Sequence, residues 1–174
     1  MKPGLKYGLI AAAGMSAWML GEYVLGLHST HIRISDYTGF GVVLIFLGAL
    51  WRMLHRQLYL PNRTWLPVWE GLLHGLVASL VTALGFYVFL SLYLHFINPE
   101  YADLTLEQYI AVMRADGRSE ESIRALAREF RWSQSPVGLP FYVFKIYLTV
   151  GVIASPLLTL WLNWRRKEQP IHAR

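Results

Sequence analysis

The feature that most restricts the fold is an uncharged segment, Gly71–Ile97. It runs for 27 residues without an Asp, Glu, Lys or Arg, although it contains His74 and His95. A helix needs about 20 apolar residues to cross the hydrocarbon core of a bilayer. The alternative is a long buried helix in a soluble protein, and the length of the segment argues against it. We therefore predict that this segment spans a membrane.

Three further segments have the same apolar character. They comprise residues 7–27, which include Glu22, residues 37–54, which end near Arg52, and residues 141–164, which contain Lys145 and Pro156. The composition agrees, because 55% of the residues are hydrophobic and 16% are charged, against roughly 25% charged residues in average soluble domains. The sequence thus predicts an all-α fold in which residues 1–174 form one membrane domain with four transmembrane helices.

The first of these segments also has features of a signal peptide, because Lys2 and Lys6 precede an apolar run. The run is long for that purpose, and no A-x-A-like cleavage site follows Leu20. We therefore expect this segment to be an uncleaved membrane anchor.

The distribution of basic residues predicts the orientation of the four helices. With the N-terminus in the cytoplasm, the inner segments hold nine basic residues against Glu70 and Glu168. The nine are Lys2, Lys6, Arg52, Arg56, Arg63, Arg165, Arg166, Lys167 and Arg174. The long outer segment holds five arginines against seven acidic residues. Because cytoplasmic loops carry the excess of Lys and Arg, we predict a multi-pass protein of the bacterial cytoplasmic (inner) membrane with both termini in the cytoplasm.

Aromatic residues at the ends of the predicted spans fit this orientation, since Trp and Tyr are enriched at membrane–water interfaces. On the cytoplasmic side they are Trp51, Trp65, Trp69, Trp161 and Trp164. On the outer side they are Tyr93, Phe96, Phe141 and Tyr142. We expect these side chains to anchor the helices at the two interfaces.

Residues 98–140 are predicted to form a helical hairpin outside the membrane. These 43 residues are too many for a structureless loop in a compact domain. Thr105 opens the capping-box pattern T-L-E-Q at the start of a first helix, and Gly117 suits the end of that helix. Ser119 is a favourable N-cap for a second helix.

Each predicted hairpin helix has one apolar face, and Glu120 and Arg124 have the spacing of a weak ion pair on the second helix. The apolar faces contain Leu106, Ile110, Met113, Ile123, Leu126 and Phe130. Such faces need a partner. In one interpretation, the two helices pack on each other and on the outer ends of the spans. In the other, their apolar faces dock another protein or lie on lipid.

Small residues recur at every fourth position in three of the predicted spans. The first span has Gly8, Ala12 and Ser16, the third has Gly71, Gly75, Ser79 and Ala83, and the fourth has Gly151, Ser155 and Thr159. Stripes of this kind let helix backbones approach closely in a membrane. We expect them to join helices within one chain, and contact between two copies of the chain is the alternative.

Two charged residues fall inside predicted spans, where charges are costly and often functional. Glu22 and Lys145 lie at similar depths near the outer ends of the first and fourth spans. We predict an ion pair between them. The alternative is that each side chain reaches the outer interface separately.

A second group of polar residues lies at the same outer boundary. His28 and His31 are three residues apart, His95 ends the third span and Asp36 is nearby in the sequence. Three imidazoles and a carboxylate could bind Zn²⁺ or Cu²⁺. The His28-x-x-His31 pattern nevertheless differs from the H-E-x-x-H of metalloproteases, so metal binding is only a weak hypothesis and no cofactor is predicted.

No other catalytic pattern is present in the sequence: it contains no G-x-S-x-G, P-loop or G-x-G-x-x-G motif and no cysteine. Its basic residues lie at the ends of apolar segments rather than on a soluble module, so nucleic acid is not an expected partner. We expect a non-catalytic accessory or assembly subunit of an envelope complex. A small oligomeric transporter or channel is the first alternative, and a metal-dependent or lipid-modifying membrane enzyme is the second.

The order of these segments resembles that of a bacterial inner-membrane family catalogued as domain of unknown function 4199. The resemblance rests on L-K-Y-G-L-I at Leu5–Ile10, G-F-G-V-V-L-I-F-L-G at Gly39–Gly48, the basic turn Arg52–Arg63, W-E-G-L-L-H-G-L at Trp69–Leu76, A-D-G-R-S-E-E-S-I at Ala115–Ile123 and the closing Arg165, Arg166 and Lys167. This chain departs from the expected pattern by having more Arg and Trp and fewer Lys. The resemblance implies four membrane spans, and it implies neither an activity nor catalytic residues.

Overall fold

The computed structural model describes residues 2–29, 34 and 37–168. Over these residues the chain forms six α-helices and one π-helical turn and contains no β-strand. In chain order the elements are α1 (Pro3–Val24), α3 (Phe40–Leu58), α4 (Val68–Leu92), η1 (Tyr93–Ile97), α5 (Tyr101–Ala115), α6 (Glu120–Ser133) and α7 (Gly138–Glu168). The predicted all-α fold is therefore confirmed.

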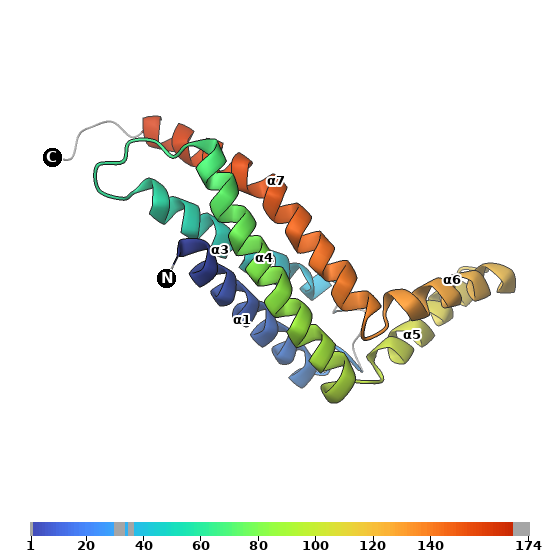
Figure 1. The fold of residues 1–174 in the computed structure, drawn as a ribbon. Helices are drawn as coiled ribbons and strands as arrows, with labels where there is room; N and C mark the ends of the chain where they lie inside the picture. Colours follow the sequence, from blue (N-terminus) through green and yellow to red (C-terminus); the bar gives the residue numbers. More distant parts are fainter. Residues whose placement is uncertain (1, 30–33, 35–36, 169–174) are drawn as a thin grey trace.

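The four long helices, α1, α3, α4 and α7, lie side by side as a bundle, and α5 and α6 form an arm beyond one end of it (Figure 1). Helix α1 runs parallel to α4, because its Gly4 lies against Val77 and its Ala12 lies against Gly85. The start of α1, the end of α7 and the turn between α3 and α4 all lie at the end opposite the arm (Figure 1). The turn at that end is held by the Asn163 amide, which donates to the Leu66 carbonyl at 2.8 Å.

Helices α4 and α7 run antiparallel and meet through complementary small residues. Gly71 faces Thr159, and Gly75 faces Ser155, so that a methyl group at either glycine would overlap the opposite side chain. Gly151 of α7 faces Ser79 of α4 in the same way. The predicted stripes of the third and fourth spans thus pack against each other within one chain. Each buried hydroxyl donates to a carbonyl of its own helix, as the Ser79 hydroxyl does to Gly75 at 2.7 Å.

Two apolar clusters fill the bundle on either side of this contact. The cluster nearer the arm comprises Ala11, Met15, Met19, Val42, Phe46, Ala83, Phe86, Leu90, Tyr93, Leu94 and Tyr147. The cluster at the opposite end comprises Tyr7, Leu50, Met53, Leu54, Leu58, Leu66, Ala78 and Leu162. Large side chains therefore fill the two ends, whereas small ones bring α4 and α7 together between them.

The ends of the arm helices agree only in part with the sequence prediction. The Ser119 hydroxyl accepts from the Ser122 amide and caps α6, and Gly117 has a positive φ of 70° at the end of α5, as predicted. The capping box at Thr105 was wrong, because α5 begins four residues earlier and the Thr105 hydroxyl donates to the Tyr101 carbonyl. Glu120 forms an ion pair with Arg114 of the preceding helix at 3.3 Å. Among the described ion pairs, none joins Glu120 to Arg124 as the sequence predicted.

The apolar faces of α5 and α6 lie against each other. Leu106 and Ile123 are buried, and Ile110, Met113, Leu126 and Phe130 are half-buried. The rings of Tyr109 and Phe130 are in contact across the two helices, with centroids 5.3 Å apart. The face that the sequence offered for a partner is therefore largely occupied by the arm itself.

We predict that the contact between Gly75 and Ser155 depends on their combined volume. Gly75→Ser should destabilise the detergent-solubilised protein by about 1–3 kcal/mol, the usual cost of an overpacked core. Exchanging the pair, Gly75→Ser with Ser155→Gly, should recover most of that loss in thermal unfolding. Gly48→Ala is the control, since a Cβ there meets nothing within 4 Å. Equal losses in the single and exchanged variants would contradict the prediction.

Candidate functional site

A cluster of buried polar side chains lies at the end of the bundle next to the arm. Glu22 is 6% exposed, His28 is 3% exposed, Asn98 is 7% exposed and Tyr93 is fully buried. They come from three places: the last turn of α1, the turn that follows it and the π-helical end of α4. Polar groups buried to this extent need partners, because an unpaired one is costly.

The turn after α1 brings His28 back over Glu22. Gly26 has a positive φ of 72°, the conformation that favours glycine. The Gly26 amide donates to the Tyr23 carbonyl and the Leu27 amide donates to the Glu22 carbonyl, both at 2.9 Å. This hydrogen-bond pattern is a Schellman motif, which satisfies the carbonyls at the helix end and reverses the chain.

The π-helical turn places the other two members of the cluster. The backbone amide of Asn98 donates to the backbone carbonyl of Tyr93 at 2.8 Å and closes the turn. The Asn98 side chain then reaches back, and its Nδ2 donates to the Tyr93 hydroxyl at 3.2 Å. Single π-helical turns occur frequently at functional sites.

Contacts join these residues into one chain of donors and acceptors. The Nδ1 atom of His28 lies 2.6 Å from the Tyr93 hydroxyl, and its Nε2 atom lies 3.4 Å from Oε2 of Glu22. The Trp18 indole donates to Oε1 of Glu22 at 2.9 Å and contacts the Thr38 carbonyl at 3.1 Å. One neutral form of His28 fits all of these contacts: Nε2 carries the proton toward the carboxylate, and Nδ1 accepts from the phenol.

Burial lowers the pKa of His28 from its ordinary value of 6.5, and the charge of the adjacent Glu22 opposes the shift without cancelling it. The imidazole is enclosed by Tyr93 and by Tyr101 of α5, whose ring centroid is 5.2 Å away. Among the described residues, the titratable groups that face it are one carboxyl group, that of Glu22, and the two phenols of Tyr93 and Tyr101.

A cavity of about 190 Å³ lies beside the cluster. Glu22, His28, Tyr101 and Tyr147 contribute its polar groups. The remaining walls are Met19, Gly39, Val42, Phe86, Leu90, Leu139 and Val143. A mostly apolar cavity into which a few polar groups converge is typical of sites for small molecules.

A family model described as "Protein of unknown function (DUF4199)" matches residues 6–162. The chain belongs to this family. The matched range includes every residue of the buried cluster and both helices of the arm. No curated protein and no solved structure matches the chain. The DUF4199 family brings no assigned activity with it, so the chemistry of the site has to be argued from its geometry.

The ion pair predicted for Glu22 and Lys145 is not among the ion pairs of the described residues of this DUF4199 protein. Glu22 contacts His28 and Trp18 instead. Lys145 is exposed, and its Nζ atom lies 5.0 Å from the centroid of the Phe141 ring on its own helix. Helix α7 is therefore oriented so that Lys145 faces outward while Tyr147 faces the core.

The histidines proposed as metal ligands are not brought together where the structure describes them. His28 is buried in the cluster, whereas His95 is exposed and packs against the Phe96 ring. His31 lies outside the described residues. Within residues 2–29, 34 and 37–168, no three His, Cys, Asp or Glu side chains are grouped closely enough to hold a metal ion.

Three members of the cluster were not predicted from the sequence to belong to a site. Tyr93 was predicted to be an interface anchor, and this was wrong, because its side chain is fully buried on the same helix face as Phe86 and Leu90. Trp18 and Asn98 had no signal of their own. The glycine at Gly26, two residues before His28, was the available sign that the chain reverses there.

We predict that His28 makes the protein less stable in acid. The unfolded chain binds the His28 proton more readily than the folded protein does. The contribution of neutral His28 to the free energy of unfolding is therefore fully present above about pH 6.5. It is lost as the pH falls below that value, by up to about 1.4 kcal/mol per pH unit. Thermal unfolding between about pH 7 and pH 5 should show this loss, and His28→Gln should flatten that part of the curve. An unchanged slope in His28→Gln would assign the pH dependence to other groups.

Proposed function

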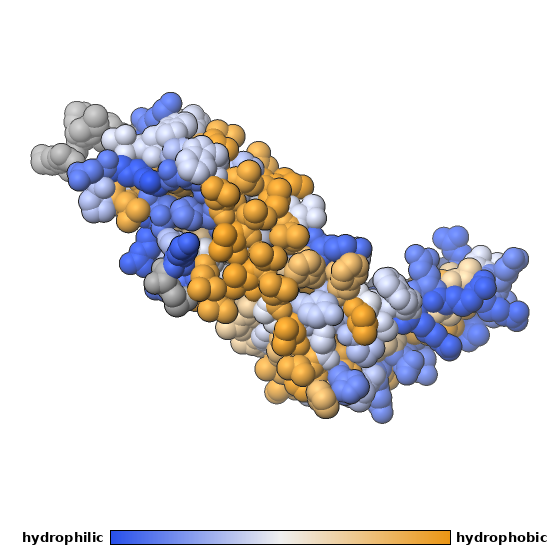
Figure 2. All heavy atoms as spheres, viewed as in Figure 1, coloured by the Kyte–Doolittle hydropathy of each residue, from blue (hydrophilic) through white to orange (hydrophobic). Residues whose placement is uncertain are grey.

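We propose that this DUF4199 protein crosses the bacterial cytoplasmic membrane four times and acts as a non-catalytic accessory subunit that presents its α5–α6 arm on the outer side. The observation that carries the proposal is an exposed apolar belt around the middle of the bundle. Figure 2 displays part of the belt as hydrophobic side chains over the bundle, next to a hydrophilic arm.

All four long helices contribute to the belt. Its exposed side chains include Leu9 and Ile10 of α1, Phe40 and Leu44 of α3, Leu73, Leu84 and Val88 of α4, and Ile153, Leu157 and Leu160 of α7. Contiguous apolar surface of this extent favours contact with lipid over contact with water. Two helical stretches, Val68–Ile97 and Gly138–Lys167, are long and apolar enough to span a membrane by themselves. Helices α1 and α3 complete the bundle and carry charged residues near their ends.

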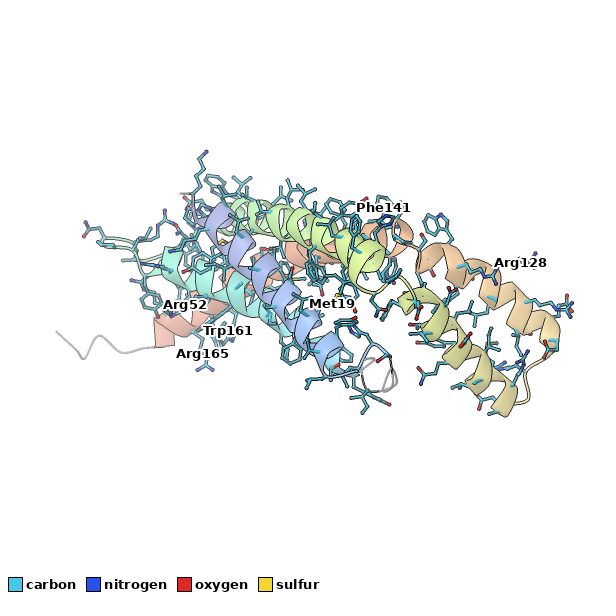
Figure 3. The ribbon with its side chains drawn as sticks, turned by 90° about the horizontal axis from the view of Figure 1, so that it is seen from below. Met19, Arg52, Arg128, Phe141, Trp161 and Arg165 are labelled. Carbon is cyan, nitrogen blue, oxygen red and sulfur yellow. The ribbon has the colours of Figure 1, made fainter. Side chains whose placement is uncertain are left out.

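Basic and aromatic side chains at the end opposite the arm support the orientation. Arg52, Trp161 and Arg165 gather there, and Arg165 lies 5.3 Å from the Trp161 ring (Figure 3). Arg166 lies over Tyr59 and Lys167 lies over Trp65 in the same manner. An interface with excess Arg and Lys and exposed Trp is typical of the cytoplasmic side.

The interior of the bundle favours an accessory role over transport. A transporter or channel needs polar groups along a path through the bundle. The buried hydroxyls in its middle, including those of Ser79, Thr82 and Ser155, donate to carbonyls of their own helices. The enzyme hypothesis rested on the histidines, which the described structure does not group. The arm, in contrast, extends away from the bundle and bears Arg128 on its surface (Figure 3).

We predict that single cysteines will report this topology, since the chain has none of its own. A cysteine at Ser119 should react with a membrane-impermeant maleimide in intact spheroplasts. A cysteine at Thr64 should react only after permeabilisation, because the turn between α3 and α4 is predicted to be cytoplasmic. Both positions are exposed, so a difference in labelling reports the side of the membrane. Equal labelling of the two positions before permeabilisation would refute the four-span topology.

The accessory role predicts that the outward face of α6 contacts a protein. This face carries Glu120, Glu121, Arg124, Arg128 and Arg131. A photo-crosslinking residue in place of Ala127 should give one adduct of defined mass in native membranes. Reversing Arg124, Arg128 and Arg131 to Glu should abolish the adduct, and changing them to Lys should preserve it by keeping the charge. An adduct that survives charge reversal, or no adduct at all, would contradict this role.

A further inference from the structure

The cavity beside the polar cluster has an unusual balance of charge. Glu22 lies on its wall and is 94% buried, being 6% exposed. In residues 2–29, 34 and 37–168, no Lys or Arg lies within ion-pair distance of its carboxylate. The one basic partner in that part of the chain is His28, whose charged form is disfavoured by burial. Among these residues no fixed positive charge therefore lies beside the Glu22 carboxylate, and a bound cation would supply one.

Glu22 also has acceptor capacity to spare. A carboxylate offers about four lone-pair sites. The Trp18 indole occupies one on Oε1, and His28 faces one on Oε2. Further donors can therefore reach the carboxylate from the cavity.

Aromatic rings form much of the remaining wall. Phe86 and Tyr147 meet edge to face with centroids 6.0 Å apart, and Tyr101 covers the side nearest the arm. Tyr147 is 6% exposed, and no described hydrogen bond uses its hydroxyl. No described polar atom is both sealed from solvent and without a partner, and Tyr147 is one of the residues that line the cavity. Cations bind favourably over the faces of such rings.

We propose that this cavity binds a small organic ammonium ion, with the ammonium group at Glu22 and the apolar part against Phe86, Tyr101 and Tyr147. Size supports this class of ligand, because an apolar cavity of about 150 Å³ accommodates benzene and this cavity measures about 190 Å³. A metal cation would need six or more oxygen ligands of the kind that Ca²⁺ and Mg²⁺ take, and the walls are mainly aliphatic and aromatic. An anion would be repelled by Glu22.

A second cavity borders the same carboxylate residue. It measures about 490 Å³ and is lined by Gly14, Ala17, Trp18, Gly21, Glu22, Leu25, Leu27 and Thr38. Glu22 is the residue that the two cavities share. An ammonium ion with an aromatic or aliphatic body partitions into the interfacial region of a bilayer, and the carboxylate is within reach from both sides.

The test compares a cation with a neutral molecule of the same shape. The full-length protein in nanodiscs of zwitterionic lipid is titrated with benzylamine and with benzyl alcohol, and heat is corrected with empty nanodiscs. The ammonium compound should bind at least about tenfold more tightly, because only it pairs with the carboxylate. Saturable binding with equal affinity for the two compounds would overturn the proposal, as would no saturable binding of benzylamine.

Two variants identify the site. Glu22→Gln should weaken benzylamine binding at least about tenfold and leave benzyl alcohol nearly unchanged. Val143→Phe fills the cavity without touching the hydrogen bonds of the cluster, so it should abolish binding of both compounds even if Glu22→Gln folds poorly. The exposed Lys145→Gln is the matched control and should bind like the natural protein. Full benzylamine binding by Val143→Phe would place the ligand elsewhere and refute the proposal. None of these results depends on the accessory role, which is tested at the arm.

Discussion

Close contact between α4 and α7 is the interaction on which the rest of the structure depends. Helices in lipid gain no hydrophobic free energy by associating, so they associate through close packing and hydrogen bonds. Gly71, Gly75 and Gly151 each oppose a hydroxyl-bearing side chain on the facing helix. Each glycine lets the two backbones approach closely. The hydroxyl-bearing side chain on the facing helix fills the space beside the glycine. Helix α1 extends the arrangement on the other side of α4, where the Thr82 hydroxyl also contacts the Gly8 carbonyl at 3.1 Å.

The polar cluster lies beyond this contact, at the end of the bundle next to the arm. Small residues hold α4 and α7 together at Gly75 and Ser155, whereas the arm-proximal halves carry Phe86 and Tyr147. The cavity lies at that end and is lined by residues of α1, α3, α4 and α7. Tyr101 of the arm also lines it, and its ring meets His28. Side-chain size therefore increases along this helix pair from the small-residue contact toward the cavity.

The sequence was informative wherever a local rule governs the structure. Small residues at every fourth position identified the faces of α4 and α7, and Gly117 and Ser119 identified the turn between the arm helices, because a positive φ and a side-chain cap are properties of single residues. The partner of Glu22 could not be found in this way. Lys145 matched it in depth, but the rotation of α7 about its axis decides which side chain faces inward, and that rotation is set by the packing of Tyr147 in the core. Tyr93 was misplaced although its spacing from Phe86 and Leu90 puts all three residues on one helical face, which is buried in the core.

The buried cluster is costly for a bundle that could be stabilised by apolar packing alone. Replacing buried charged groups by well-packed apolar ones is often neutral or stabilising, so a Glu, a His and a Tyr in contact at this position need a compensating role. Cohesion between α1 and α4 is one such role, because the network joins the turn after α1 to the end of α4. Cohesion alone, however, needs only neutral hydrogen bonds such as the one between His28 and Tyr93. A carboxylate adds a net charge and unused acceptors at the wall of a cavity, beyond its contacts with Trp18 and His28. The cationic ligand that we propose for the cavity would account for Glu22 as well as for its neutral neighbours.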